Sequence, residues 1–408
     1  MEFMVDDGVQ RRADDFFMTR IGSVLRNKKR KASFSLYVRG LIGDGDRKSV
    51  EPIAARACAD EKKVDAVHQQ LLHFVSVSAW DDRAVRREAA RYALDVMTER
   101  EPVQIWAVDD TGFLKQGKHS VGVQRQYTGS AGKTANCQIG VSLTVCTLTE
   151  QLPIDFELYL PRSWTEDPAR RAEAKIPSAV VFKTKPELAL EMLKRAVEDG
   201  VPQGVVVIDS GYGDNGPFRA GVRKLGLCYA AEVHAPTTVL DVDGHGQGRT
   251  RPVSVRTLAE QLPRRRFRKV VWRDGTKKPL AADFARVRVV VGHDDGTDVA
   301  EREQVWLLIE RPFDPSEPMR YYLLTLPKNL SMQQLVHFVK QRWRTERMYE
   351  DVKGELGLDH FEGRLFRGWH HHVSAVLCCY AFILAERVRR FPPSRGGSGT
   401  SPSFSRAA

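Results

Sequence analysis

The chain has 408 residues, enough for two or three domains at roughly 100–200 residues each. Its 63 lysines and arginines outnumber its 52 aspartates and glutamates, and the net charge of +11 favours an anionic partner. The hydrophobic fraction of 42% excludes a wholly disordered chain, and no apolar run reaches the roughly 20 residues that span a bilayer. The six cysteines form no C-x-x-C pair, which excludes a zinc ribbon and indicates reduced, intracellular thiols.

The first hundred residues are predicted to be helical. Apolar residues recur at three- and four-residue spacings in 50–59, 62–77 and 83–98, and no strand pattern interrupts them. A strongly basic stretch, residues 20–31, also reads as helical. A basic helical domain usually binds an anion or packs on a neighbour, and we expect residues 1–100 to form a DNA-binding N-terminal domain.

Strands and helices alternate from residue 101 onward, which indicates an α/β core over 101–234. Short β-branched runs predict strands, and helical spacing bounded by glycine or proline predicts helices between them. The predicted strands are 103–108, 138–148, 153–160, 204–208 and 227–233, and the helices are 185–199 and 216–225.

The residue pattern of the sequence changes at residue 235. Residues 235–320 alternate and are rich in Arg, Val and Thr, which predicts a β-rich insertion. The core is then expected to resume over 321–391, with a strand at 321–326, one long helix over 331–356 and a buried helix over 370–390. The tail, 392–408, is rich in Gly, Ser and Pro and is expected to be disordered.

Two of the predicted strands end in aspartate, at Asp109 and at Asp209. Chemistry in α/β sheets lies at the carboxyl ends of the strands, and two such carboxylates with a third from a helix suit Mg²⁺ or Mn²⁺. Two ions about 3.5–4 Å apart activate a water or a 3′-hydroxyl for phosphodiester chemistry. A single strand-terminal Asp is more often a cap or turn residue. Two of them in a chain of this charge favour catalysis.

The order of elements resembles the ribonuclease-H-like fold, and several stretches resemble DDE transposases of bacterial insertion sequences. The stretches VDDTGFLKQGKHSVGVQRQYTGSAGKTANCQIGVSL, LYLPRSWTEDPARR, DSGYGD and RWRTERMYEDVKGELGLDHFEGR are similar to the insertion-sequence 701 family, within the group related to insertion sequence 4. The resemblance is collinear from about residue 15 to 390. It implies a ribonuclease-H-like α/β core interrupted by a β-rich insertion, with a helical N-terminal domain.

The resemblance also implies a catalytic triad of metal-binding acids. These are Asp109, Asp209 and Glu346, and Asp110 is the alternative for the first of them. They would hold two Mg²⁺ or Mn²⁺ ions. A Tyr–Arg–Glu–Lys signature of the larger group matches at Arg342, Glu346 and Lys353, which implies that Arg342 and Lys353 contact DNA phosphate. Val339 stands at the tyrosine position, so the tyrosine contact is missing.

The implied function is that of a transposase, a metal-dependent endonuclease and DNA strand transferase. Its partners would be double-stranded DNA, both the terminal inverted repeats and the target, and a second copy of the chain. It would act in the bacterial cytoplasm at the nucleoid, without a membrane. A catalytically silent DNA-binding regulator and a stand-alone metal nuclease are the alternatives, and the intact acids argue against the first.

The insertion offers two further candidates for DNA contact. In related transposases a tryptophan there can stack on a flipped base, and Trp272, beside Arg268, Lys269 and Arg273, is the better candidate than Trp306. A tryptophan in a β region is more often part of the core. The basic run at 264–269 is either a face that follows the DNA backbone or a solvated strand edge.

Helix geometry makes two predictions about the C-terminal half. Consecutive residues point about 100° apart, so His370, His371 and His372 cannot face one ion and are expected at a helix start or on the DNA backbone. If 331–356 is one helix, Arg342, Glu346 and Lys353 share a face, which also carries Glu350, whereas Asp351 points away. Polar residues after the first acid, in a predicted hairpin, either neutralise phosphate or are structural: Lys115, Lys118, His119, Arg125 and Gln126.

Overall fold

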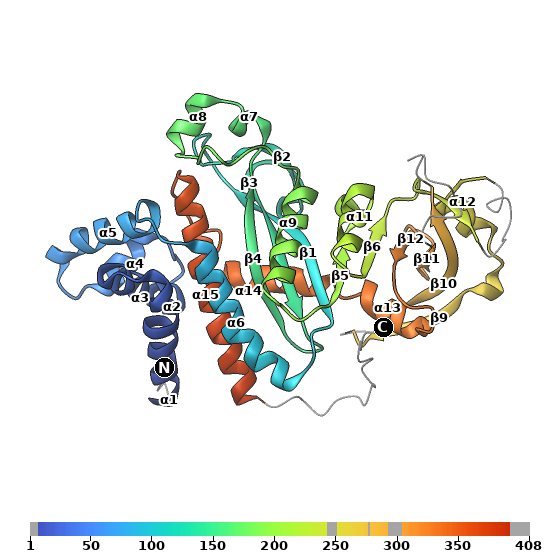
Figure 1. Ribbon diagram of the computed structural model, residues 1–408, viewed down its shortest axis with the longest axis horizontal. Helices are drawn as coiled ribbons and strands as arrows, with labels where there is room; N and C mark the ends of the chain where they lie inside the picture. Colours follow the sequence, from blue (N-terminus) through green and yellow to red (C-terminus); the bar gives the residue numbers. More distant parts are fainter. Residues whose placement is uncertain (1–6, 243–250, 276–277, 293–303, 392–408) are drawn as a thin grey trace. The chain divides into compact units, whose positions relative to one another are not determined.

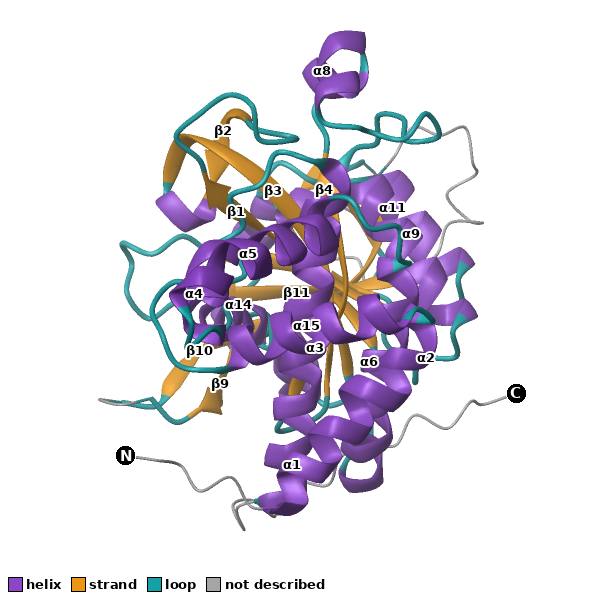
Figure 2. Ribbon diagram, turned by 90° about the vertical axis from the view of Figure 1, so that its left-hand side faces the viewer, coloured by secondary structure: helices purple, strands orange, loops and turns teal. Residues whose placement is uncertain are grey.

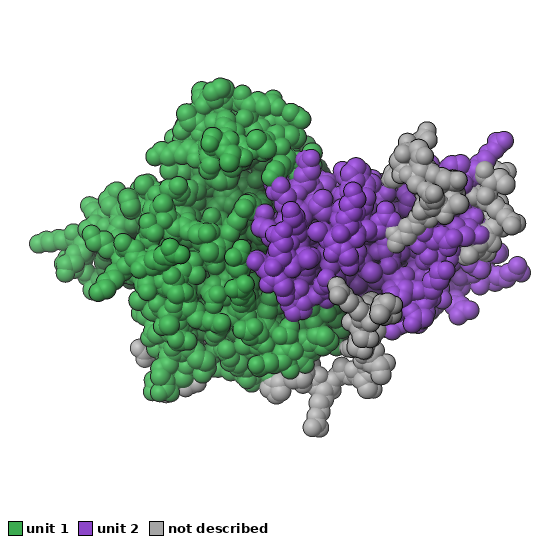
Figure 3. Space-filling view, in the orientation of Figure 1, with its two compact units in different colours: residues 1–104, 110–184, 345–408 green, residues 105–109, 185–344 purple. Residues whose placement is uncertain are grey.

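The computed structural model describes residues 7–242, 251–275, 278–292 and 304–391. Their contacts divide the chain into two compact units, coloured separately in Figure 3. Unit 1 contains residues 1–104, 110–184 and 345–408, and unit 2 contains residues 105–109 and 185–344. No described helix is both long enough and apolar enough to cross a membrane. The predicted tail, 392–408, lies outside the described residues.

Unit 1 begins with the predicted run of helices (Figure 1). The chain forms α1 (Asp7–Asp14), a π-helical turn (Asp15–Arg20), α2 (Ile21–Leu25), α3 (Lys28–Ile42), α4 (Val50–Ala57), α5 (Glu61–Ser76) and α6 (Asp82–Arg100). The helix predicted over 20–31 is interrupted, because Arg26 has a φ of 60° and the Asn27 side chain caps the start of α3. Asp60 and Asp81 cap α5 and α6 in the same way.

A long C-terminal helix joins the N-terminal helices in unit 1. This helix, α15 (Phe366–Arg390), packs along α6 and also contacts α3 and α5 (Figure 2). Phe16 and Phe382 stack with ring centroids 5.7 Å apart, which gives the two ends of the sequence one aromatic core. The first hundred residues therefore belong to the same compact unit as residues 110–184.

The strands of unit 1 form an antiparallel arrangement. They are β2 (Gln124–Thr128), β3 (Lys133–Cys146), β4 (Gln151–Tyr159) and the second half of β1 (Ile105–Leu114), with β3 paired to all the others. Short helices α7 (Arg162–Thr165) and α8 (Pro168–Glu173) follow, and α14 (Trp343–Gly354) contributes its residues from Thr345 onward. The hairpin strand β2 is additional to the predicted strands.

Unit 2 carries the remaining strands in the order β1-β5-β6-β12-β11-β10-β7-β8, with β9 on β10. The first half of β1 and β5 (Val205–Ile208) are parallel, as are β5 and β6 (Tyr229–Val233). The β-rich insertion is observed as predicted. It contains β7 (Thr238–Asp241), β8 (Val253–Ser254), α12 (Val255–Gln261), β9 (Arg268–Arg273), β10 (Leu280–Val291) and β11 (Gln304–Arg311), followed by β12 (Arg320–Leu324). The other helices are α9 (Lys185–Glu198), α10 (Ser210–Gly213), α11 (Gly216–Lys224) and α13 (Met332–Val339).

Two predictions about element bounds were wrong. Strand β1 does not end at residue 108 but continues to Leu114, because its second half pairs with β3 after its first half has paired with β5. The single helix over 331–356 is divided into α13 and α14. The break falls at residues 340–342, where the Lys340 ammonium pairs with Glu310 on β11 and the Arg342 guanidinium pairs with Asp109 on β1.

Candidate active site

The first two predicted acids lie on neighbouring parallel strands of unit 2. The ladder between β1 and β5 pairs Ala107 with Val207. Asp109 and Asp209 each follow their paired residue by two positions, and neighbouring strands are about 5 Å apart. The fold thus places two acids that are 100 residues apart in the sequence along neighbouring strands, although Asp109 lies within its strand and not at its end.

Asp109 is a buried carboxylate within β1, with 7% of its surface exposed. Its Oδ2 lies 3.2 Å from Nη1 of Arg342, whose side chain is 34% exposed. A carboxylate that has lost most of its water needs such a cation nearby. Asp110, the next residue, is only half-buried. The two alternatives for the first acid therefore differ in burial.

Asp209 ends its strand and starts a helix. Its Oδ1 accepts hydrogen bonds from the backbone N–H of Gly211 at 3.0 Å and of Tyr212 at 3.3 Å, so it is the N-cap of α10. The turn is tight because Gly213 lies against β6, where a Cβ would come within 1.8 Å of the Glu232 carbonyl oxygen. A capping role was the alternative to a catalytic role for a strand-terminal Asp. Asp209 does cap α10, and its carboxylate lies at the end of β5.

The turn after Asp209 carries a hydrogen-bond network that sequence analysis did not identify. The imidazole of His234 hydrogen-bonds to the Asp214 carboxylate through Nδ1, and its Nε2 lies 3.3 Å from the Ser210 hydroxyl. Asp214 also accepts hydrogen bonds from the His234 backbone N–H and the Thr237 hydroxyl. The only sequence signal was the second Asp of DSGYGD. These contacts fasten the start of β7 to the turn after Asp209.

Glu346 lies in the first turn of α14 and is exposed. Because α14 begins at Trp343, Arg342 precedes the helix, and the predicted shared face does not extend to it. Glu350 is exposed and lies 3.5 Å from Arg347, which also pairs with Asp351. Glu346 and Lys353 both lie within α14 and keep their predicted helical relation.

Lys353 is held within unit 1 by protein acceptors. Its Nζ donates to the Thr111 hydroxyl at 2.8 Å and to the Gly112 carbonyl at 2.9 Å, both on β1, and lies 3.4 Å from the Ser130 hydroxyl. Burial lowers the pKa of Lys353 from its ordinary value. Arg342 and Lys353 are thus both attached to β1 in this structure.

The donors fit a hard divalent cation in kind, because carboxylate oxygens are the ligands that Mg²⁺ and Mn²⁺ prefer. Among the described residues, however, no three His, Cys, Asp or Glu side chains are grouped closely enough to hold an ion as they stand. Within unit 2 the guanidinium of Arg342 occupies one side of the Asp109 carboxylate. An ion bound through the same carboxylate oxygen would therefore displace this guanidinium.

The insertion tryptophans differ in their surroundings. Trp272 on β9 is half-buried, meets Phe284 edge-on and carries the Lys340 ammonium 4.6 Å above its ring. Trp306 is 9% exposed and is covered by Arg286 and Arg288. A third tryptophan, Trp343, was not singled out from the sequence, although it directly follows Arg342. It is 42% exposed, with Arg273 4.3 Å from its ring.

Other basic residues are divided between surface and structure. In the run 264–269, Arg264, Arg265, Arg268 and Lys269 are exposed and Phe267 is buried. In the hairpin after β1, Lys115 donates to the Phe361 carbonyl and His119 pairs with Glu173, whereas Arg125 is exposed.

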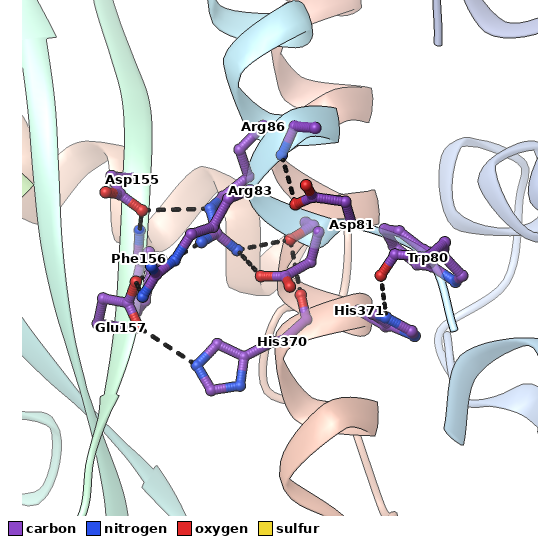
Figure 4. A network of polar contacts seen from close by, with 12 residues as sticks. Trp80, Asp81, Arg83, Arg86, Asp155, Phe156, Glu157, His370 and His371 are labelled. Atoms are coloured by element: carbon purple, nitrogen blue, oxygen red, sulfur yellow. Dashed lines mark hydrogen bonds and ion pairs between the residues drawn. The ribbon is translucent and has the colours of Figure 1, made fainter. Parts of the chain in front are cut away.

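The three consecutive histidines point to three different partners, as helix geometry predicted. His370 lies 3.4 Å from Glu157, in a buried network with Arg86 (Figure 4). His371 stacks on Trp80, and His372 accepts a hydrogen bond from the Tyr37 hydroxyl at 2.7 Å. All three are buried in the early turns of α15, which agrees with the helix-start alternative of the prediction.

Comparisons with known proteins agree with this geometry. A family model described as DDE superfamily endonuclease matches residues 20–279, and one described as transposase DDE domain matches residues 180–382. The chain is 24% identical over 327 residues to the probable transposase for insertion sequence element IS701 of Microchaete diplosiphon. The match covers 79% of this chain and 74% of that protein. The family resemblance and the ribonuclease-H-like fold class predicted from the sequence are confirmed.

Proposed function

Since the chain belongs to the family of DDE superfamily endonucleases, we propose that it is a transposase that cuts DNA strands at the ends of an insertion sequence and joins them to target DNA. The observation that carries the proposal is the pair of in-register strands that bear Asp109 and Asp209. The match to a transposase of the insertion-sequence 701 type over most of both chains supports it.

The proposed metal ligands are Asp109, Asp209 and Glu346. Two Mg²⁺ or Mn²⁺ ions held by these acids would activate the attacking oxygen and stabilise the leaving oxygen. Asp109 is favoured over Asp110 because it is buried and paired with Arg342. Glu346 is favoured over Glu350 because Glu350 lies beside Arg347, one turn farther from Arg342.

The chain's own residues position the acids and the DNA. The backbone N–H groups of Gly211 and Tyr212 fix the rotamer of Asp209. Lys353 ties α14 to β1, two to three residues beyond Asp109, and we propose that it also contacts a phosphate. Arg342 is the second proposed phosphate contact, and Trp272 is a proposed base contact in the insertion.

The charge of +11 supports DNA as the partner. We propose that the N-terminal helices, residues 1–100, bind the terminal inverted repeats, and that the exposed arginines at 264–269 follow the DNA backbone. Two copies of the chain would act together on the two ends, in the cytoplasm at the nucleoid. A silent DNA-binding regulator would bind the same ends without cutting them.

The test is a strand-transfer assay with a labelled duplex from the element's end, a supercoiled target plasmid and Mg²⁺. We expect labelled plasmid from the unaltered chain and none from Glu346→Gln, whereas its matched control Glu350→Gln stays active. Asp109→Asn and Asp110→Asn form a second matched pair, and only the first should be inactive. Nicking without transfer would identify a nuclease, and end binding without either reaction would identify the silent regulator.

A further inference from the structure

The inference concerns the ion pair between Asp109 and Arg342 in unit 2. A proposed catalytic acid that is 7% exposed already has a cation 3.2 Å from its Oδ2. That cation belongs to a residue proposed to contact DNA. A divalent ion bound at Asp109 would repel this guanidinium, which favours a contact of Arg342 with a phosphate in place of the carboxylate. The two roles therefore compete or alternate.

The fold places Arg342 beside Asp109 through the break between α13 and α14. Lys340, two residues earlier, is fixed by both carboxylate oxygens of Glu310 and lies over the ring of Trp272. The Tyr322 hydroxyl donates to the same carboxylate at 2.8 Å. The backbone before Arg342 is thus anchored, while the Arg342 side chain, 34% exposed, keeps access to water.

We infer that Arg342 is an exchange cation. It balances the Asp109 carboxylate in the protein without DNA and metal, and it moves to a DNA phosphate when Asp109 takes up a divalent ion. The inference rests on the proposed function, because it assumes that Asp109 is a metal ligand. It adds that DNA and the ion bind cooperatively. An ion at Asp109 makes Arg342 available to a phosphate, and a phosphate that takes up Arg342 makes Asp109 available to the ion.

Such coupling has a function for an enzyme that cuts DNA. The ion pair raises the free energy of loading Asp109 when no DNA phosphate can accept the guanidinium. By thermodynamic reciprocity, a loaded Asp109 strengthens the Arg342 contact to DNA. The acid is therefore prepared for cleavage where a bound DNA backbone is present.

The first experiment measures binding of Mn²⁺ alone to the full chain, from the electron paramagnetic resonance signal of free Mn²⁺. Arg342→Gln should bind Mn²⁺ roughly tenfold more tightly than the unaltered chain in the absence of DNA. Arg347→Gln also removes one positive charge, from an exposed site on α14. It should leave the affinity for Mn²⁺ within about twofold of the unaltered chain. Asp109→Asn should remove this binding in both backgrounds. Circular dichroism verifies that each variant is folded.

The second experiment follows the guanidinium itself. Phenylglyoxal modifies accessible arginines, and peptide mass spectrometry gives the rate at each one. The rate at Arg342 should rise several-fold when Mn²⁺ is added, and Asp109→Asn should raise it without Mn²⁺. The rate at Arg347 serves as the internal control and should stay constant.

The outcomes separate the inference from the proposed function. Mn²⁺ binding that depends on Asp109, combined with an unchanged affinity in Arg342→Gln and an unchanged labelling rate, overturns the exchange and leaves the metal site intact. If Asp109→Asn leaves Mn²⁺ binding unchanged, Asp109 is not a metal ligand, and the exchange is overturned as well. A rise in both measurements, limited to Arg342, establishes the exchange.

Discussion

Two groups of acids and cations in this chain are built from the same residue types and differ in how far the cation is buried. In unit 1, Arg86 is 2% exposed and lies within 4 Å of Asp82, Asp155 and Glu157 (Figure 4). In unit 2, Asp109 is 7% exposed, but its partner Arg342 is one-third exposed. The residues of the first group come from α6 and β4, which contact each other and α15. In the second, the Arg342 side chain is 34% exposed to solvent.

The two groups differ in the burial of the cation, and we propose that this difference, and not the presence of an ion pair, separates a structural cluster from a catalytic site. Burial tends to raise the pKa of Glu157, but His370, Arg86 and Arg83 hold it well below its usual range. Removing Arg86 takes the buried cation away from all three of these carboxylates. In the partly exposed group, the exchange proposed above would let a phosphate or an ion take the place of the partner that leaves.

The largest expected effect is on catalysis. Asp209→Asn should lower strand cleavage by roughly a thousandfold or more, because it removes a metal ligand. It should leave the free energy of unfolding nearly unchanged, because Asn caps α10 as well as Asp does. Asp209→Ala should lose the same activity and also about 1 kcal/mol of stability. Cleavage assays and urea unfolding of both variants measure this; full activity in Asp209→Asn contradicts the assignment.

The next effect concerns the closed cluster. Arg86→Met should lower the free energy of unfolding by about 3–5 kcal/mol, because three carboxylates lose their buried cation. Arg83 pairs with Glu157 but is 53% exposed, so Arg83→Met should cost less than about 1 kcal/mol. Urea unfolding measures both. Equal effects would show that burial does not separate the two arginines.

Acid should destabilise the histidine region of unit 1. Burial lowers the pKa of His371 and of His372 to about 4 each, against about 6.5 in an unfolded chain. The unfolded state therefore binds more protons between these values, and stability is lost as the pH falls from about 6.5 to 4. Each histidine contributes up to about 1.4 kcal/mol per pH unit. His371→Gln and His372→Gln should each flatten the dependence of urea unfolding on pH, and an unchanged slope would refute the shifts.

The smallest effect distinguishes Arg342 from Lys353. Arg342→Gln should reduce the slope of log affinity against log salt for end DNA by about one, because one phosphate contact is lost. Lys353→Met should reduce it less, because its Nζ is shared with Thr111 and Gly112. Fluorescence anisotropy of a labelled end duplex over a salt series measures both slopes. A larger reduction in Lys353→Met would reverse the comparison.

The sequence by itself determined the class of elements and the candidate acids. The β-branched run before Asp209, the helical spacing of residues 185–199 and the alternation after residue 235 predicted the corresponding elements, because they depend on local residue spacing. The motif DSGYGD and the acids at 109 and 346 were also visible without a structure. The separation of His370, His371 and His372 followed from helix geometry alone.

Only the tertiary structure decided where elements end and which charges meet. Strand β1 continues past Asp109 because β3 pairs with its second half, and the helix after Ser331 breaks because Lys340 and Arg342 reach separate acids. These partners are distant in the sequence, so no local pattern encodes them. Burial likewise distinguishes Arg86, which is 2% exposed, from Arg342, which is 34% exposed, and the free energy of an ion pair depends on how much water remains around it.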